Sequence, residues 1–175
     1  MARTDSHTDA ATAAAPSLRD ATMADVSSLM AIELECFDAP VAFGRRRIRD
    51  LVQNPRAIAP VVVCGGRIVA WGIGLIRPHR KHRSGRIYNL AVSVAARGRG
   101  LGMLLVGHLV DRLTERGATR IYLEVESGNA AAIALYRSAG FTPARELPDY
   151  FGPGRPGLSM CRDVGQGKVA EPEEA

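Results

Sequence analysis

The chain has 175 residues, enough for one domain with a substantial hydrophobic core. Apolar residues make up 46% of it and charged residues 23%, as in ordinary soluble globular proteins, and no apolar run reaches the roughly 18 residues that a membrane-spanning helix needs. The net charge is +5, which favours anionic partners such as phosphates or nucleic acids without choosing among them.

Both ends of the chain differ in composition from its centre. The first 17 residues contain Asp5 and Asp9 and lack a compact apolar segment, which argues against a secretion signal. The last residues are equally poor in large apolar side chains. We therefore expect disordered tails at residues 1–17 and 164–175, on either side of one folded domain at residues 18–163.

In the first half of this domain, the spacing of apolar residues predicts a strand, two helices and a hairpin, followed by a basic loop. The two arms of the hairpin are rich in β-branched residues and are joined by Gly65-Gly66, a pair typical of tight turns. The expected elements are a strand at 17–22, helices at 23–37 and 42–54, the hairpin at 57–76 and the loop at 77–84.

The second half alternates strands with helices. Apolar and polar residues alternate in ATRIYLEVE, which predicts a strand with Glu124 and Glu126 on its polar face. Gly117 and Gly140 are placed to end the helices on either side of it. The expected elements are strands at 85–94, 118–126, 141–150 and 157–164 and helices at 101–116 and 129–139. This order predicts an α/β fold with a mixed sheet.

The cysteines, Cys36, Cys64 and Cys161, are odd in number and show neither a CxxC pair nor metal-ligand spacing. We expect them to be reduced, buried thiols of a cytoplasmic protein. No metal site is expected.

Residues 97–102 read Arg-Gly-Arg-Gly-Leu-Gly and lead directly into the helix expected at 101–116. A helix N-terminus has unpaired N–H groups and a partial positive charge, and glycines let the backbone approach a phosphate closely. The segment therefore suits a pyrophosphate, although a glycine-rich turn with solvated arginines is the alternative. Two familiar phosphate loops are excluded, because Met103 takes the last glycine position of GxGxxG and no GK[ST] follows.

The pattern Arg97-x-x-Gly100-x-Gly102 resembles the Q/R-x-x-G-x-G/A signature of the GNAT superfamily of acetyltransferases. The resemblance extends over residues 18–163. It is most specific where LEV, NAAAIALY and GF follow one another, as in the branch that includes the ribosomal-protein alanine N-acetyltransferases. It implies a GNAT fold with a mixed, mostly antiparallel central sheet of six to seven strands flanked by about four helices.

The resemblance also implies acetyl-CoA as cosubstrate. In this family the N–H groups of the glycine loop hold the pyrophosphate, and the strand before the loop pairs through its backbone with the pantetheine arm. Asn129 matches an asparagine that contacts the cofactor, but it could equally serve only as a helix cap. The implied cofactor-binding residues are Leu90, Ala91, Val92, Arg97, Gly98, Arg99, Gly100, Leu101, Gly102, Met103 and Asn129.

Acetyl transfer to an amine needs a neutral nitrogen and a proton for the departing thiolate. An α-amine is roughly 10% neutral at pH 7 and a lysine only about 0.04%, so a base is needed more acutely for lysine. Glu124 could accept the amine proton directly or through water, and the Tyr136 phenol could protonate the sulfur. Both positions match the base and acid of the ribosomal-protein alanine N-acetyltransferases. The alternatives are an exposed strand carboxylate for Glu124 and a core aromatic residue for Tyr136.

The segments expected to bind the acceptor resemble that branch least. Residues 33–48 lack a tryptophan associated with the ribosomal enzymes, and here Glu35 is either a second carboxylate near the amine or a surface residue. Tyr150 either shapes the acceptor pocket or covers the core. The basic loop at 77–84 is either a solvated turn or a site that attracts an acidic acceptor or RNA and repels a basic protein N-terminus.

These observations predict a cytoplasmic, acetyl-CoA-dependent N-acetyltransferase in which the amine attacks directly. The expected acceptor is a protein N-terminal α-amine. A small-molecule amine or a lysine is the alternative acceptor, and a non-catalytic acetyl-CoA-binding or RNA-binding module is the alternative class. We expect no membrane partner, no nucleic-acid partner, and either a monomer or a homodimer.

Overall fold

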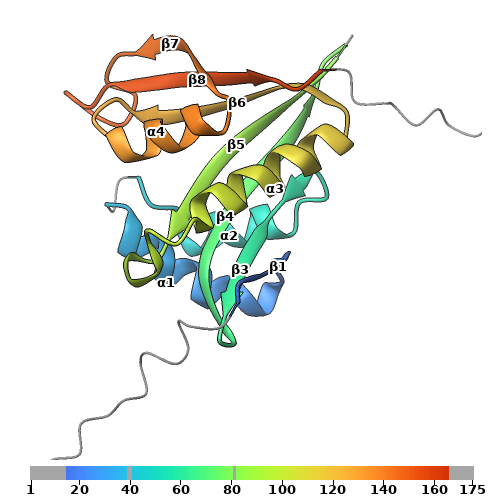
Figure 1. Ribbon diagram of the computed structural model, residues 1–175, viewed down its shortest axis with the longest axis vertical. Coiled ribbons are helices and arrows are strands. Elements are labelled where there is room, and N and C mark those ends of the chain that lie inside the picture. Colours follow the sequence, from blue (N-terminus) through green and yellow to red (C-terminus); the bar gives the residue numbers. More distant parts are fainter. Residues whose placement is uncertain (1–14, 39–40, 81, 166–175) are drawn as a thin grey trace, which may run out of the picture.

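A single mixed sheet of eight strands forms the centre of the computed structural model, which describes residues 15–38, 41–80 and 82–165 (Figure 1). The strands lie in the order β1-β3-β4-β5-β6-β8-β7, and β2 pairs with β4 beside this row. All neighbours are antiparallel except β5 and β6. In chain order the elements are β1 (Ser17–Asp20), η1 (Met23–Asp25), α1 (Val26–Cys36), α2 (Arg45–Val52), β2 (Ala57–Ile58), β3 (Pro60–Cys64), β4 (Arg67–Pro78), β5 (Arg83–Val92), η2 (Val94–Ala96), α3 (Leu101–Glu115), β6 (Ala118–Glu126), α4 (Ala130–Ser138), β7 (Thr142–Leu147) and β8 (Gly157–Asp163).

This architecture confirms the predicted α/β fold with a mostly antiparallel sheet and four α-helices. The sheet has eight strands rather than six to seven, because the first arm of the expected hairpin breaks at Ala59 into β2 and β3, which both pair with β4. The basic loop is also shorter than predicted. Antiparallel pairing of β4 with β5 continues to Pro78 and Arg83, so only residues 79–82 connect the two strands.

Helices cover the sheet on both faces, and side chains that alternate along each strand divide between them. Val61 and Trp71 pack with α1 and α2, whereas their neighbours Val62 and Ala70 pack with the start of α3. Figure 1 shows α3 lying across β4 and β5. Along the second half of the sheet, α3 and α4 bury the apolar face of β6 together with Met160 of β8.

Strands β5 and β6 diverge in the middle of the sheet. They pair in parallel only over residues 83–86 of β5. Beyond this point β5 continues with β4 as far as Val92, and β6 continues with β8 as far as Glu126. Tyr88 is an extra residue in β5 opposite the step from Ile73 to Gly74, and such a bulge bends a strand. The divergence, visible in Figure 1, leaves the edge of β5 open toward β6.

The cysteines differ in burial from the prediction. All three are free thiols, but only Cys64 is buried, and Cys36 and Cys161 are half-buried. Cys36 ends α1, and Cys161 pairs in register with Tyr122 on the polar side of β6 rather than on the side that α4 covers.

None of the helices in residues 15–38, 41–80 and 82–165 has the length and apolar character needed to cross a membrane. In the same part of the chain, no three His, Cys, Asp or Glu side chains gather closely enough to hold a metal ion. The predicted tails lie almost entirely outside the described residues.

Candidate active site

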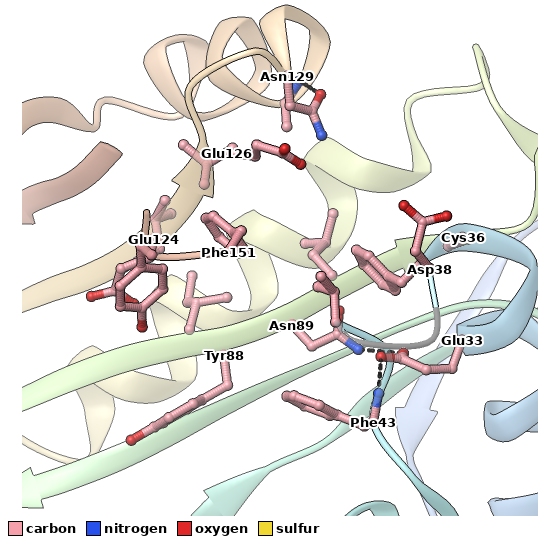
Figure 2. Close-up of a pocket in the computed structure, with 18 of the residues that line it drawn as sticks. Glu33, Cys36, Asp38, Phe43, Tyr88, Asn89, Glu124, Glu126, Asn129 and Phe151 are labelled. Carbon is pink, nitrogen blue, oxygen red and sulfur yellow. Dashed lines mark hydrogen bonds between the residues drawn. The ribbon is translucent and has the colours of Figure 1, made fainter. Parts of the chain in front are cut away.

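A pocket of about 500 Å³ opens where β5 and β6 diverge (Figure 2). Its walls come from segments far apart in the sequence: the end of α1 and the segment after it, the start of α2, the outer part of β5, residues 123–126 of β6, α4 and the connection between β7 and β8. Five residues selected from the sequence line it, namely Leu90, Glu124, Asn129, Tyr136 and Tyr150. The open strand edge, a carboxylate and a phenol therefore meet in one cavity.

Glu124 lies on β6 and forms an ion pair with Arg86 of β5. The distance between Glu124 Oε2 and Arg86 Nη2 is 2.5 Å, and the Glu124 side chain is 14% exposed. Burial raises the pKa of Glu124 above the usual glutamate range, although the nearby guanidinium groups act in the opposite direction. A raised pKa makes the carboxylate a better proton acceptor near neutral pH. Nothing in the local sequence pattern singled out Arg86.

Tyr136 points inward from α4 and is 8% exposed. Its ring packs edge-on against Phe141, with ring centroids 6.1 Å apart. Burial raises the pKa of Tyr136 to about 12, because the phenolate would lose its hydration. The hydroxyl therefore keeps its proton at neutral pH. This side chain belongs to the core cluster and also lines the pocket, so the two roles considered from the sequence do not exclude each other.

The start of α3 has the geometry expected of an anion site. Gly98 and Gly100 have φ values of 74° and 75°, which only glycine adopts without strain, and a Cβ at either position would meet no atom within 4 Å. Gly100 is the N-cap of α3, so the first N–H groups of the helix have no partner within it. The space beside Gly98 and Gly100 is open at the point where the sequence predicts a phosphate.

Other residues of this loop have structural roles in addition. Leu101 is buried in the core, so only its backbone can serve a ligand. A Cβ on Gly102 would lie 3.1 Å from Leu135 Cδ2, so glycine allows a close approach of α3 to α4 here. The Arg97 side chain turns back to Val92 O, at 3.2 Å from Nε, and to Cys36 Sγ. Arg99 is exposed, and Met103 is 37% exposed.

Only part of the β5 backbone that is predicted to pair with the pantetheine arm is free to do so. Leu90 lines the pocket, and the β5 edge beyond Arg86 has no β6 partner. The carbonyl of Val92, however, already accepts hydrogen bonds from Arg97 Nε and Cys36 Sγ. Ala91 is buried among residues that pack with α1 and α2. A ligand that adds to this edge therefore finds its unused backbone groups nearer to Leu90.

Asn129 caps α4 and also lines the pocket. Its Oδ1 accepts a hydrogen bond from Ala132 N at 3.0 Å, the usual N-cap geometry. Figure 2 shows its amide at the end of the pocket near Glu126. The two alternatives for this residue are thus compatible.

Glu33, which the sequence analysis did not select, is the carboxylate that α1 contributes to the pocket. It is 1% exposed and accepts hydrogen bonds from Phe43 N at 2.9 Å and Asn89 Nδ2 at 2.6 Å (Figure 2). Glu35 does not line the pocket. Its Oε1 accepts from Ser93 Oγ and Val94 N, which ties α1 to the segment after β5. Glu33 falls on the apolar stripe of α1, seven residues after Val26 and four after Leu29, and this position was the available signal.

Replacing Glu33 with alanine should lower the free energy of unfolding by about 3 kcal/mol, because it leaves two buried donors without an acceptor. Urea unfolding followed by circular dichroism measures this change. The matched control is Glu35→Ala on the exposed side of the same helix, with an expected cost under about 1 kcal/mol. Equal effects of the two substitutions would contradict the structural role given to Glu33.

The same residue should give stability a dependence on pH. Burial raises the pKa of Glu33, so the folded state holds its proton more tightly than the unfolded state does. The stabilisation is complete below the ordinary glutamate pKa and is lost as pH rises through the raised pKa. Glu33→Ala should remove this slope from a plot of unfolding free energy against pH.

Comparison with known proteins agrees with this geometry. A sequence profile of the Acetyltransferase (GNAT) family matches residues 26–141, more than half of the chain. The chain belongs to the GNAT acetyltransferase family. It shares 46% identity over 65 residues with the [ribosomal protein bS18]-alanine N-acetyltransferase of Salmonella typhimurium, a match that covers 37% of this chain and 44% of that protein. The chain thus matches less than half the length of this relative.

Two longer matches complete the comparison. The L-methionine sulfoximine/L-methionine sulfone acetyltransferase of Pseudomonas paraeruginosa is 29% identical over 143 residues, which cover 75% of this chain and 83% of that protein. The crystal structure of the Escherichia coli ribosomal-protein-S18-alanine N-acetyltransferase superposes with a TM-score of 0.75 at 24% identity, over 92% of this chain and all of that one. At this identity the superposition shows that the GNAT fold is shared.

GNAT enzymes use acetyl-CoA, and two features of this site fit that molecule. The loop before α3 has open space above Gly98 and Gly100 where a diphosphate would contact N–H groups. The open edge of β5 near Leu90 lines the same pocket as Glu124 and Tyr136. Both features belong to the backbone and need no rearrangement of the sheet.

Gly100→Ala should weaken acetyl-CoA binding at least about tenfold, since a Cβ would occupy the space that the diphosphate needs. Gly66→Ala is a close control, because Gly66 also has a φ of 75° and open space around its Cβ position, but lies in the turn between β3 and β4. Both variants should lose similar thermal stability from backbone strain. Titration calorimetry with acetyl-CoA should find weaker binding only in Gly100→Ala; equal affinities would contradict the assignment of the loop.

Proposed function

We propose that this GNAT protein transfers the acetyl group of acetyl-CoA to a primary amine by direct attack, and that the acceptor is a protein N-terminal α-amine. The observation that carries the proposal is the presence of Glu124 and Tyr136 in one pocket, which the open edge of β5 near Leu90 also lines. One group has the properties of a proton acceptor and the other those of a proton donor.

Glu124 removes a proton from the attacking amine, either directly or through a water molecule. The amine nitrogen forms a bond to the acetyl carbon, the carbon–sulfur bond breaks, and the Tyr136 hydroxyl supplies the proton that the thiolate takes. Arg86 holds the Glu124 carboxylate in place and keeps it ionised until it takes up the proton. The backbone of β5 near Leu90 and the loop before α3 orient the thioester.

The choice of an α-amine rests on chemistry and on similarity. An α-amine is neutral far more often than a lysine at neutral pH, so a partly paired carboxylate such as Glu124 suffices as its base. The Salmonella relative is named for its action on an alanine of a ribosomal protein. A small-molecule amine is the second candidate, because the Pseudomonas relative, named for two amino-acid derivatives, matches a much larger part of the chain.

A thiol-release assay with acetyl-CoA tests the proposal. The panel contains peptides with free N-termini, the same peptides with blocked N-termini and an internal lysine, and small amines. Turnover restricted to free N-termini supports the α-amine assignment, and turnover restricted to small amines replaces it with the second candidate. Tight acetyl-CoA binding without turnover of any amine overturns the proposed transfer.

A further inference from the structure

A second hollow, of about 440 Å³, lies beside the active site on the face of the sheet that no helix covers at this end. It is lined by the ends of β4 and β5 and by β6, β7 and β8. Glu124 and Arg86 line both this hollow and the active-site pocket. The ion pair between them therefore separates the two spaces, and a group bound in the hollow lies next to the proposed base.

Strand register explains why so many polar side chains meet here. Side chains of residues paired across a sheet lie on the same face. Arg77 pairs with Ser84, Arg86 pairs with Tyr122, and Ser159 lies between Glu124 and Arg145. These residues lie on one face of the sheet across five strands, on the side opposite to the apolar residues that pack against α3 and α4.

The hollow carries an excess of positive charge. Its lining contains three arginines and two histidines, but Glu124 is its only carboxylate and is already paired with Arg86. Within the described ranges, neither Arg77 nor Arg145 makes an ion pair; Arg77 instead donates to the hydroxyl of Tyr88 and lies 5.4 Å from the centre of its ring. Both guanidinium groups are close enough to lower the pKa of Glu124. Two cations thus face the hollow without a counter-charge.

Two histidines of the connection between β4 and β5 also line the hollow. The rings of His79 and His82 stack with centroids 4.5 Å apart, and His79 Nε2 lies 2.9 Å from the hydroxyl of Ser84. This arrangement closes the outer end of the hollow with groups that can donate hydrogen bonds. A concave surface of one charge sign concentrates ligands of the opposite sign and rejects those of the same sign.

We propose that the acceptor is an amine that carries a carboxylate a few bonds from its nitrogen, and that Arg77 and Arg145 bind this carboxylate in the second hollow while the nitrogen lies against Glu124. The inference rests on the proposed acetyl transfer and specifies its substrate class. Bidentate contact with a carboxylate suits the planar guanidinium group. The same cations disfavour an ammonium ion beside Glu124, which helps the acceptor to lose its proton, and they disfavour basic N-termini.

Two kinds of acceptor share this chemistry. One is a free amino acid, whose own carboxylate stands next to its amine. The other is a protein N-terminus with Asp or Glu at its second position. The test therefore uses pairs of similar size in which one member carries the carboxylate: a peptide beginning Ala-Asp against one beginning Ala-Asn, and L-methionine against L-methioninamide. Each kcat/KM is expressed per concentration of neutral amine, because a nearby carboxylate raises the pKa of the amine.

Steady-state kcat/KM for each pair is measured with the wild-type protein, the double variant Arg77→Gln/Arg145→Gln, and the control Arg112→Gln, an exposed position on α3 that pairs with Glu115 outside both spaces. The wild type and the control should prefer the carboxylate member of at least one pair by about tenfold or more, and the double variant should lose that preference. Both members of a pair use the same base. If the double substitution acted only through Glu124, it would therefore lower kcat/KM equally for both members.

The outcomes separate the two proposals. A preference in the peptide pair assigns an acidic protein N-terminus, and a preference in the methionine pair assigns a free amino acid. Turnover of the neutral members with no preference for the carboxylate overturns the inference and leaves the proposed transfer intact. An equal preference in the wild type and the double variant also overturns the inference. Absence of turnover for every member overturns both.

Discussion

Replacing Glu124 with glutamine should lower kcat/KM about 10²- to 10⁴-fold, the usual contribution of a general base. The amide is close to the same size and can still contact Arg86, but it cannot take a proton. Titration calorimetry should show that acetyl-CoA still binds, because Glu124 is remote from the loop before α3 that is expected to hold the diphosphate. Glu146→Gln is the matched control: it removes the same charge from an exposed position on β7 outside both spaces, and it should leave kcat/KM unchanged.

The pH profile provides a second readout for the same residue. Glu124 acts when ionised, and burial raises its pKa, so activity should increase with pH through a value above the usual glutamate range. The free acceptor amine adds a second ionisation at about pH 8. On the acid side, log kcat/KM should therefore rise with a slope that approaches 2 in the wild type and 1 in Glu124→Gln. Identical profiles would show that Glu124 is not the base.

Replacing Tyr136 with phenylalanine should lower kcat about 100-fold with little change in acetyl-CoA affinity. The substitution removes only the hydroxyl and keeps the ring against Phe141. Since the pKa of Tyr136 is about 12, the wild-type phenol is protonated across the working pH range and can supply its proton to the thiolate. Rapid-quench measurement of a single turnover isolates the chemical step.

Phe141→Leu is the control for this experiment. It disturbs the same aromatic contact but leaves the hydroxyl of Tyr136 in place. It should therefore lower the melting temperature while largely keeping the single-turnover rate. If both variants lost rate in proportion to stability, Tyr136 would be a core residue only. If Tyr136→Phe kept its full rate, the proton would come from another group or from water.

The positions of Glu124 and Glu126 illustrate how far local pattern extends. Alternation along ATRIYLEVE predicted a strand with both carboxylates on its polar face, and β6 has this form. Their partners could not be predicted in the same way. Arg86 reaches Glu124 from β5, and Arg155 makes a two-pronged ion pair with Glu126 from the connection between β7 and β8. Such pairings depend on which strands are neighbours in the sheet, and this cannot be read from the order of the strands along the chain.

The two carboxylates of α1 show the opposite case. Helical spacing distinguishes the buried Glu33 from the exposed Glu35, yet the sequence analysis considered only Glu35, as either a second carboxylate or a surface residue. The apolar face of a helix normally excludes a carboxylate, so one that lies there needs buried donors. Phe43 N and Asn89 Nδ2 are those donors, and they come from the segment before α2 and from β5.

Local sequence patterns were enough to predict the helices and strands, the glycines at turns and helix ends, and the family resemblance. Strand alternation, helical spacing and the turn glycines act over a few residues, so they are readable in order along the chain. Which groups share a cavity, in contrast, depends on how the folded strands and helices are arranged. Residues far apart in the chain meet in three places: where β5 diverges from β6, around Glu33, and on the sheet face that carries Arg77, Arg86 and Arg145. Their meeting depends on strand order and register, which arise when the whole sheet assembles against its helices.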